Sequence, residues 1–422
     1  MANIYNTFEF VGALTVKKDT DKSKGYEVTK YESGWNKERL LLNVKADDSS
    51  QLVEISDMYS TNPGYKLKKK TPKEKQADGT FKDGSELEIA WKDRNLQSIL
   101  DKVANWQKYI LDFSNNKERY DLRTSIEKLE KNEISEDDVK VQYGTADISE
   151  LKEKLTELEN MKFEFLNKVD MIAKLREELP KHPNLKFKIT GDINFYESMK
   201  SHNVGKNFMV KKIEKALDKD KVGLKGDIDI YFNEDSLNED MFEDTKKYII
   251  NGYVKSFDSQ LKQDIYLPYP LIVDASRLDM NNPQHKGRVD MLISPFKDCE
   301  EDVIYELQYK VKFARGAERK EITLDDLSDW QRMAVESGIE DFEKLKRELG
   351  GNTLGDKIDE TRTIGFNLKD FPEGAVATGL QLSEMLVDKQ LLLEEQSKDS
   401  KENKESVMED DNSGSDDLDD LL

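Results

Sequence analysis

A strand pattern with a glycine at its centre occurs twice in this chain and restricts the possible folds more than any other feature. Apolar residues at every second position indicate a half-buried strand, and a glycine within the strand allows it to bend. The two copies match position for position, as Phe8, Phe10, Gly12 and Leu14, and as Phe187, Ile189, Gly191 and Ile193. The repeat predicts two β-rich domains that each open with the same strand.

Further patterns fill the rest of the chain. Alternation of apolar residues predicts strands at 8–16, 37–46, 51–60, 87–91, 185–196, 207–213, 224–232, 249–257, 265–273, 289–293 and 305–313. Apolar residues spaced three and four apart predict helices at 93–113, 147–179, 324–349 and 380–393. We expect the helix at 147–179 to pack against 117–139 as a helical hairpin. An intermolecular coiled coil is less favoured, because Lys162 and Arg176 interrupt one of the two heptad series.

These patterns predict an α+β fold with two OB-like β-barrel domains, a helical insertion between them and a disordered acidic C-terminal tail. The glycine in the first strand of each barrel would let that strand bend and pair on both sides. We expect the N-terminal OB-like domain at 1–113, the helical linker or hairpin at 114–182, the second OB-like domain at 183–320, a C-terminal helical region at 321–393 and the tail at 394–422.

Composition limits the location and chemistry of the protein. The chain is 36% charged, and no apolar run is long enough to span a bilayer. Its first residues lack the features of a signal peptide and Cys299 has no partner for an intrachain disulfide, so we expect a cytoplasmic protein. With three histidines and one cysteine we expect no metal site and no cofactor. The formal net charge of −21 means that any surface for nucleic acid must be local.

Aromatic residues beside lysine and arginine indicate such a local surface, because bases stack on aromatic rings and phosphates pair with cations. The candidates in the first domain are Tyr26, Tyr31, Trp35, Lys37, Arg39, Tyr59, Tyr65, Lys66, Lys68, Lys69, Lys70 and Trp91. The candidates in the second domain are Lys206, Phe208, Lys211, Tyr253, Lys255 and Phe257. Other interpretations stay open: the lysine run at 66–75 is also typical of a solvated loop, and the rings of Trp91 and of 253–257 are also typical of strand packing.

The C-terminal tail is acidic and ends in two leucines. Such a segment cannot bury enough apolar surface to fold, so it is typical of a partner-binding tail, of a competitor for a basic groove or of a solubilising tail. The residues that we expect to bind a partner are Asp416, Asp417, Leu418, Asp419, Asp420, Leu421 and Leu422.

The glycine-marked strand at 8–16, the segment 35–44 and the tail together resemble the acidic-tailed single-stranded DNA-binding proteins of bacteria and their phages. The resemblance covers the N-terminal domain and the tail, and this tail ends in leucines where that family has a proline and an aromatic residue. The resemblance implies sequence-independent binding of single-stranded DNA in replication, repair or recombination. It implies that the tail recruits replication or recombination proteins, in a bacterial or phage-infected cell.

Two other functions remain as alternatives. One is a non-enzymatic interaction or assembly protein in which the aromatic residues bind protein. A phage-encoded chain could have this function. The other is a magnesium-dependent nuclease, because carboxylates and a lysine of the required kinds occur at Asp227, Asp229, Asp290, Glu306 and Lys310. Carboxylates are so frequent in this chain that the pattern arises easily by chance, and we expect that the protein is not an enzyme.

Overall fold

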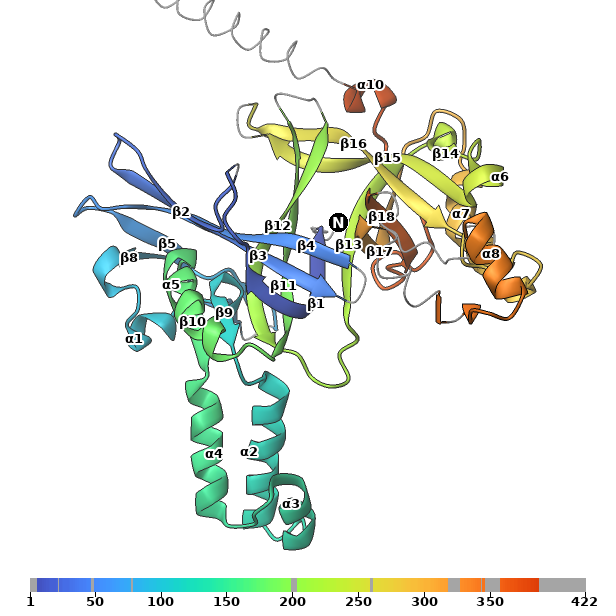
Figure 1. Cartoon of the computed structure of the whole chain (residues 1–422). Coiled ribbons are helices and arrows are strands. Elements are labelled where there is room, and N and C mark those ends of the chain that lie inside the picture. Colours follow the sequence, from blue (N-terminus) through green and yellow to red (C-terminus); the bar gives the residue numbers. More distant parts are fainter. Residues whose placement is uncertain are drawn as a thin grey trace, which may run out of the picture. The chain divides into compact units, whose positions relative to one another are not determined.

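The computed structural model describes residues 6–21, 23–46, 49–76, 79–198, 203–258, 261–317, 327–342, 344–345 and 357–386 (Figure 1). The predicted tail at 394–422 lies outside these residues. The described residues form a mixed α+β structure that is rich in strands, and their main sheet contains 15 strands. This sheet is not closed as a barrel, so the two closed OB-like barrels expected from the sequence are not confirmed.

The chain divides into two compact units that are built from interleaved segments. Unit 1 comprises Met1–Asn194, Lys206–Ile228 and Lys310–Gly365. Unit 2 comprises Phe195–Gly205, Asp229–Tyr309 and Phe366–Leu422. Within the described residues no helix is both long and apolar enough to cross a membrane.

The two copies of the glycine-marked strand pair with each other at the centre of unit 1. Strand β1 (Thr7–Val16) is antiparallel to β11 (Lys186–Glu197) on one side and to β13 (Gly223–Phe232) on the other. In the first pair Phe10 lies opposite Ile189, its equivalent in the repeat. Both glycines allow close approach of a neighbouring strand: a Cβ on Gly12 would lie 2.3 Å from a backbone oxygen of β3, and one on Gly191 would lie 2.0 Å from a backbone oxygen of β12.

The core of unit 1 lies on one face of these strands. Phe8, Phe10, Phe208 and Phe313 are all buried there and their rings contact one another at centroid distances of 4.6–5.7 Å. Strand β1 continues beside β3 (Trp35–Ala46), which pairs with β2 (Tyr26–Lys30) and β4 (Ser49–Ser60). Strand β12 (Val204–Lys215) joins β4 to β9 (Tyr109–Asp112). The remaining strands of unit 1 include β5 (Lys66–Lys70), β6 (Glu74–Lys75), β7 (Phe81–Lys82) and β8 (Glu86–Ala90).

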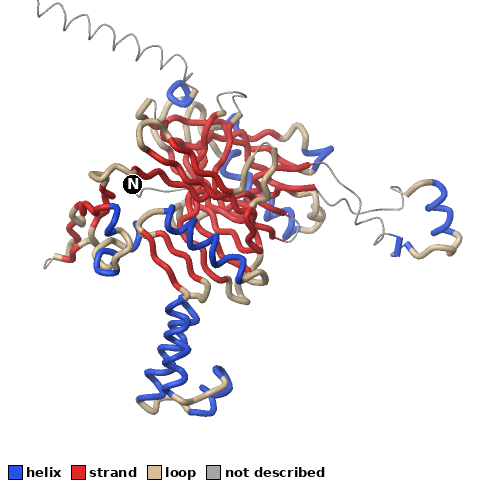
Figure 2. Tube along the Cα trace, turned by 60° about the vertical axis from the view of Figure 1, so that its left-hand side comes forward, coloured by secondary structure: helices blue, strands red, loops and turns tan. Residues whose placement is uncertain are grey.

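A helical arm is inserted between two paired strands of unit 1. Strands β9 and β10 (Lys162–Phe165) are antiparallel, and the chain between them forms α2 (Asn116–Glu130), α3 (Glu136–Tyr143) and α4 (Ile148–Asn160). Figures 1 and 2 show α2 and α4 side by side with α3 at their far end. The arm has its own core, which includes Leu122, Ile126, Leu129, Val139 and Leu151. The predicted helical hairpin between 117–139 and 147–179 is therefore confirmed in its first part.

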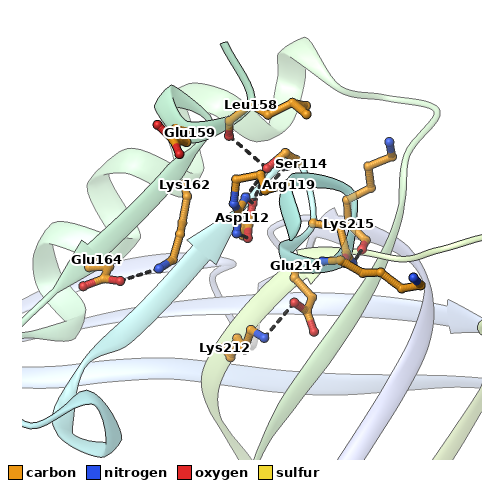
Figure 3. Close-up of polar contacts among 12 residues, drawn as sticks. Asp112, Ser114, Arg119, Leu158, Glu159, Lys162, Glu164, Lys212, Glu214 and Lys215 are labelled. Atoms are coloured by element: carbon orange, nitrogen blue, oxygen red, sulfur yellow. Dashed lines mark hydrogen bonds and ion pairs between the residues drawn. The ribbon is translucent and has the colours of Figure 1, made fainter. Parts of the chain in front are cut away.

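Buried polar contacts fix the base of this arm to the sheet. The guanidinium of Arg119 donates hydrogen bonds of 2.8 and 2.6 Å to the two carboxylate oxygens of Asp112, and it also donates to the hydroxyl of Ser114 (Figure 3). The hydroxyl of Ser114 donates to Asp112 and to the carbonyl oxygen of Leu158. Asn115 donates to the carbonyl oxygen of Lys215 on β12.

Three predicted elements are wrong, and each has a local physical reason. The expected helix at 147–179 is interrupted by β10 at Lys162, the polar residue that breaks its heptad series, and α5 (Lys168–Glu178) begins afresh after its cap Asn167. The expected helix at 93–113 is reduced to α1 (Gln97–Leu100), because its last part pairs with β10 and β12 as β9. The expected strand at 289–293 lies inside helix α7 (Pro283–Lys297).

Unit 2 contains a long antiparallel pair, β15 (Lys247–Asp258) and β16 (Gln263–Asp274). Shorter elements complete it: β14 (Leu237–Asn238), α6 (Phe242–Thr245), β19 (Val376–Ala377) and α10 (Leu382–Met385). Strands β17 (Tyr305–Ala317) and β18 (Lys357–Phe366) have residues in both units. Helix α8 (Asp329–Glu336) lies within the helix predicted at 324–349, which a non-helical segment at 337–341 interrupts. Helix α10 lies within the helix predicted at 380–393.

Candidate nucleic-acid interface

Four of the predicted aromatic residues form one continuous set of ring contacts, which we call the aromatic ladder. The ring of Trp35 meets Tyr65 edge-on at a centroid distance of 5.2 Å, and Tyr65 lies 5.6 Å from Trp91. Trp91 in turn stacks on Tyr59, at 5.3 Å with an interplanar angle of 4°. Trp35 is 37% exposed, so the ladder begins at the surface. Residues far apart in the sequence thus form one site.

The ladder is positioned by the register of the β3–β4 hairpin. Trp35 pairs with Ser60 and Asn36 pairs with Tyr59. Paired residues share a face of a sheet and neighbours along a strand point to opposite faces, so Trp35 and Tyr59 lie on opposite faces of the hairpin. Tyr65 lies in a turn that follows the end of β4. Its backbone amide donates a hydrogen bond of 2.9 Å to the carbonyl oxygen of Asn62. The ladder therefore passes around the end of the hairpin.

Arg94 contacts Trp91, the third ring of the ladder. Its guanidinium lies 3.9 Å from the ring centroid of Trp91, a cation–π contact. The same group donates hydrogen bonds of 2.8 and 2.9 Å to the two carboxylate oxygens of Asp170, in the first turn of α5. A bidentate pair of this kind fixes orientation as well as distance, so Trp91 is presented in one position.

The other candidates on or near β2 and β3 differ in whether their side chains already contact other side chains of the protein. The ring of Tyr26 lies 3.6 Å from the guanidinium of Arg176, and its hydroxyl donates to Glu38. Burial and that carboxylate raise the pKa of Tyr26. Arg39 pairs with Glu27 at 2.8 Å. By contrast, Tyr31 is 44% exposed, and Lys37, on the face of Trp35, has no ion pair with any described residue.

The predicted lysine run is not a free phosphate clamp. It forms β5, which pairs with β8, and the acidic residues of β8 neutralise part of it. Lys66 lies 2.7 Å from Glu88, and Lys68 lies 3.0 Å from Glu86. The amide of Lys70 donates to the side chain of Gln107. Lys69 does not pair with an acidic residue of β8. Its ammonium lies 5.4 Å from the ring centroid of Tyr109, and burial lowers its pKa.

The three candidates on β12 do not form the exposed binding face that the sequence predicted. Phe208 is 3% exposed and belongs to the aromatic core of unit 1, so its ring is not available to stack on a base. This corrects its assignment as a binding residue, since the alternation that suggested a binding face arises from a buried face. Lys206 pairs with Asp359 at 3.1 Å and Lys211 pairs with Asp192 at 2.5 Å.

The remaining candidates lie in unit 2 or outside the described residues. On β15, Tyr253 packs against a buried cluster, Lys255 pairs with Asp264 at 2.8 Å, and Phe257 is 64% exposed. The structure does not describe the tail residues Asp416, Asp417, Leu418, Asp419, Asp420, Leu421 and Leu422.

Sequence reasoning missed the residues that support the ladder from other elements. Arg94 and Asp170 act together across two elements, and nothing in either local sequence indicates the pairing. Tyr109 and Lys168 were assigned to helices and linkers. A signal was present for Tyr109, since the segment 109–113 is rich in residues that favour strands.

Two of the carboxylates considered for a nuclease, Asp229 and Glu306, are hydrogen-bonded to each other in unit 2. Asp229 is 5% exposed and hydrogen-bonded to Glu306, which also accepts a 2.9 Å hydrogen bond from the hydroxyl of Tyr231. Burial and then Glu306 raise the pKa of Asp229 to about 8. Asp290 lies on α7. In the part of the chain that the structure describes, no group of three or more histidine, cysteine, aspartate or glutamate residues is arranged to hold a metal ion.

No protein-family model, curated protein or solved structure matches this chain.

Proposed function

We propose that this protein binds single-stranded DNA without sequence preference and acts in DNA replication, repair or recombination. The observation that carries the proposal is the aromatic ladder of Trp35, Tyr65, Trp91 and Tyr59. Each base that stacks on an aromatic side chain contributes about 1–3 kcal/mol, and every base has a face that can stack. Such a site is therefore tolerant of sequence.

The exposed side chains next to the ladder suit an unpaired strand. Trp35, Tyr31 and Lys37 are close in sequence, and the rings of the first two are exposed while the lysine is free of ion pairs among the described residues. Bases inside a duplex are stacked on one another, so they cannot reach these rings. In this proposal β1, β3 and β4 form the DNA-binding surface, as the strands of an OB-fold do. Helix α5 packs against β3 and β4.

The tail completes the proposal as the site for protein partners. Its last residues, 416–422, would recruit replication or recombination proteins, in the cytoplasm of a bacterium or a phage-infected cell. No cofactor is part of the proposed function.

The test is fluorescence anisotropy of a labelled oligo-dT titrated with the full chain at two salt concentrations, with magnesium or with a chelator. We expect tight binding that weakens with salt while the oligomer stays intact. Trp35→Ala should weaken binding by about 1–3 kcal/mol. Trp106→Ala is the matched control, because Trp106 is 69% exposed and is not one of the rings of the ladder.

Two results would contradict the proposal: no binding at low salt, or an equal loss for Trp35→Ala and the control. A second candidate would then lead, namely an interaction or assembly protein whose ladder binds protein. The ion pairs of Lys66 and Lys68 favour this candidate, because they leave less positive charge beside the rings. Cleavage of the oligomer that requires magnesium would instead support the nuclease alternative.

A further inference from the structure

Two lysines from separate elements of unit 1 each lie close to the same aromatic ring. The ammonium of Lys69, on β5, lies 5.4 Å from the ring centroid of Tyr109, and that of Lys168, at the start of α5, lies 5.3 Å from the same centroid. Lys168 is only 9% exposed. Burial lowers the pKa of both lysines, and the charge of Lys168 lowers that of Lys69 further.

Asp57 is the acidic group with the largest effect on the two lysines, and its charge raises the pKa of both. The carboxylate of Asp57 accepts hydrogen bonds from the backbone amides of Met58 and Lys168, at 2.9 and 3.0 Å. Asp192 forms its ion pair with Lys211. Neither Lys69 nor Lys168 forms an ion pair with a carboxylate among the described residues. The two ammonium groups are thus partly buried and neither has a direct ion pair, so a further anion would be favourable beside them.

The lysine pair lies next to the aromatic ladder and next to a hollow in the sheet. Asp57 is two residues from Tyr59 on β4, so the two side chains share a face. On the other side, Lys211 and Asp192 belong to a hollow of about 560 Å³ over β1, β11 and β13. Lys225 and Lys310 also line this hollow and have no ion pair with any described residue. The carboxylates of Glu9, Asp192 and Asp227 line the hollow as well, so it holds charges of both signs.

We propose that Lys69 and Lys168, held over Tyr109, bind a phosphate group of the DNA backbone beside the base-stacking ladder. This proposal rests on the proposed function and deepens it by naming a backbone contact. A phosphate suits the site because its negative oxygens can meet two ammonium groups from different elements at once. Lysine binds phosphate as a compact charge and needs no planar geometry.

The first test measures how binding of labelled oligo-dT depends on salt. For single strands the slope of log K against log salt is about −0.7 for each phosphate that is neutralised. The double variant Lys69→Gln with Lys168→Gln should make the slope less negative by about 0.7, because one phosphate is no longer neutralised. The conservative variant Lys168→Arg should keep the slope of the natural chain, and the control Lys152→Gln, which removes an ion-paired surface lysine of the helical arm, should leave it unchanged.

The second test does not need DNA. Lysines labelled by ¹³C-methylation are titrated by NMR in the full chain, with and without inorganic pyrophosphate. We expect the anion to raise the pKa of Lys69 and Lys168, and to leave Lys68 unaffected.

The outcomes separate this proposal from the proposed function. If the natural chain binds no oligo-dT but pyrophosphate raises both pKa values, the proposed function fails and the phosphate site stands. If the natural chain binds oligo-dT, the double variant keeps its slope and pyrophosphate changes neither pKa, the lysines only pack on Tyr109 and the phosphate site is overturned. Thermal unfolding of each variant shows whether a loss of binding reflects a loss of fold.

Discussion

At the scale of single residues, Arg119 and Asp112 form a nearly dry ion pair at the base of the arm. Their side chains are 6% and 1% exposed. Burial alone would raise the pKa of Asp112, but hydrogen bonds from Arg119 and Ser114 lower it below its ordinary value. A buried charge that loses its partner is strongly unfavourable, so this pair ties α2 to the end of β9.

Asp112→Ala should therefore lower the free energy of unfolding by about 3–5 kcal/mol, because it leaves the guanidinium of Arg119 buried without a partner. Asp121→Ala is the matched control. It removes the exposed pair of Asp121 with Lys117 on the same helix, for which we expect a loss of no more than about 1 kcal/mol. Urea unfolding of both variants measures the difference, and similar losses would show that burial of the pair does not matter.

The carboxyl pair of Asp229 and Glu306 predicts a dependence of stability on pH. The folded chain keeps a proton on Asp229 up to a pKa of about 8, whereas the ordinary value is 3.8. The folded state thus binds more protons than the unfolded state between these values, and stability should fall as pH rises from about 4 to 8.

Asp229→Asn should make thermal unfolding less sensitive to pH over this range, because the amide cannot ionise. The control is Asp264→Asn, which alters a half-exposed carboxylate paired with Lys255. Melting temperatures at pH 5, 7 and 9 provide the measurement. An unchanged slope for Asp229→Asn would mean that another group carries the dependence.

At the scale of elements, the helical arm is the clearest independent piece. Its core of Leu122, Ile126, Leu129, Val139 and Leu151 is formed by residues of the arm itself. An element with its own core and few links to the sheet can open without the sheet.

Leu151→Ala should destabilise the arm by about 2–5 kcal/mol, since Leu151 is fully buried. Hydrogen exchange should accelerate in 116–160 and stay slow in β1, β3 and β11. Val141→Ala, which changes an 88% exposed residue of α3, should leave both regions unchanged. Acceleration throughout unit 1 in Leu151→Ala would show that the arm and the sheet unfold together.

Strands were easier to predict from the sequence than helices in this protein. Alternation located β1, β3, β4, β11 and β15, because burial alternates along much of each strand, and it located β13, whose second half is buried on both faces. Helical spacing failed at Lys162, where pairing with β9 outweighs local preference. At α7 the start signals, Asn282 as cap and Pro283 at the first turn, were present but outweighed by the alternation at 289–293.

The candidate site was predictable in its residue types but not in its connections. The rings of Trp35, Tyr59, Tyr65 and Trp91 were identified because aromatic residues among polar ones are seldom core. The acidic partners of Lys66 and Lys68 and the clamp on Arg94 depend on contacts between distant segments, which composition cannot reveal.

At the scale of the whole molecule, charge governs how this chain would meet DNA. The chain carries a formal net charge of −21, and seven of its last fourteen residues are acidic. The lysines available for phosphate are few and local, so an acidic segment can compete with DNA for them.

Deleting Glu409–Leu422 should tighten binding of oligo-dT at low salt, and the difference should shrink at high salt because screening weakens the competition. A variant with neutral residues at 409–411, 416, 417, 419 and 420 keeps the length of the tail and isolates its charge. Anisotropy titrations compare the three chains. Equal or weaker binding after deletion would exclude competition by the tail.

The insertion of the arm between β9 and β10 has a practical consequence for engineering. Asp112 and Lys162 are direct neighbours in the strand pair, so the two ends of the arm leave the sheet about 5 Å apart. An inserted domain whose own termini are adjacent would meet the same geometric requirement. The far end of the arm, near α3, is thus a suitable insertion site for a fluorescent reporter or an affinity tag.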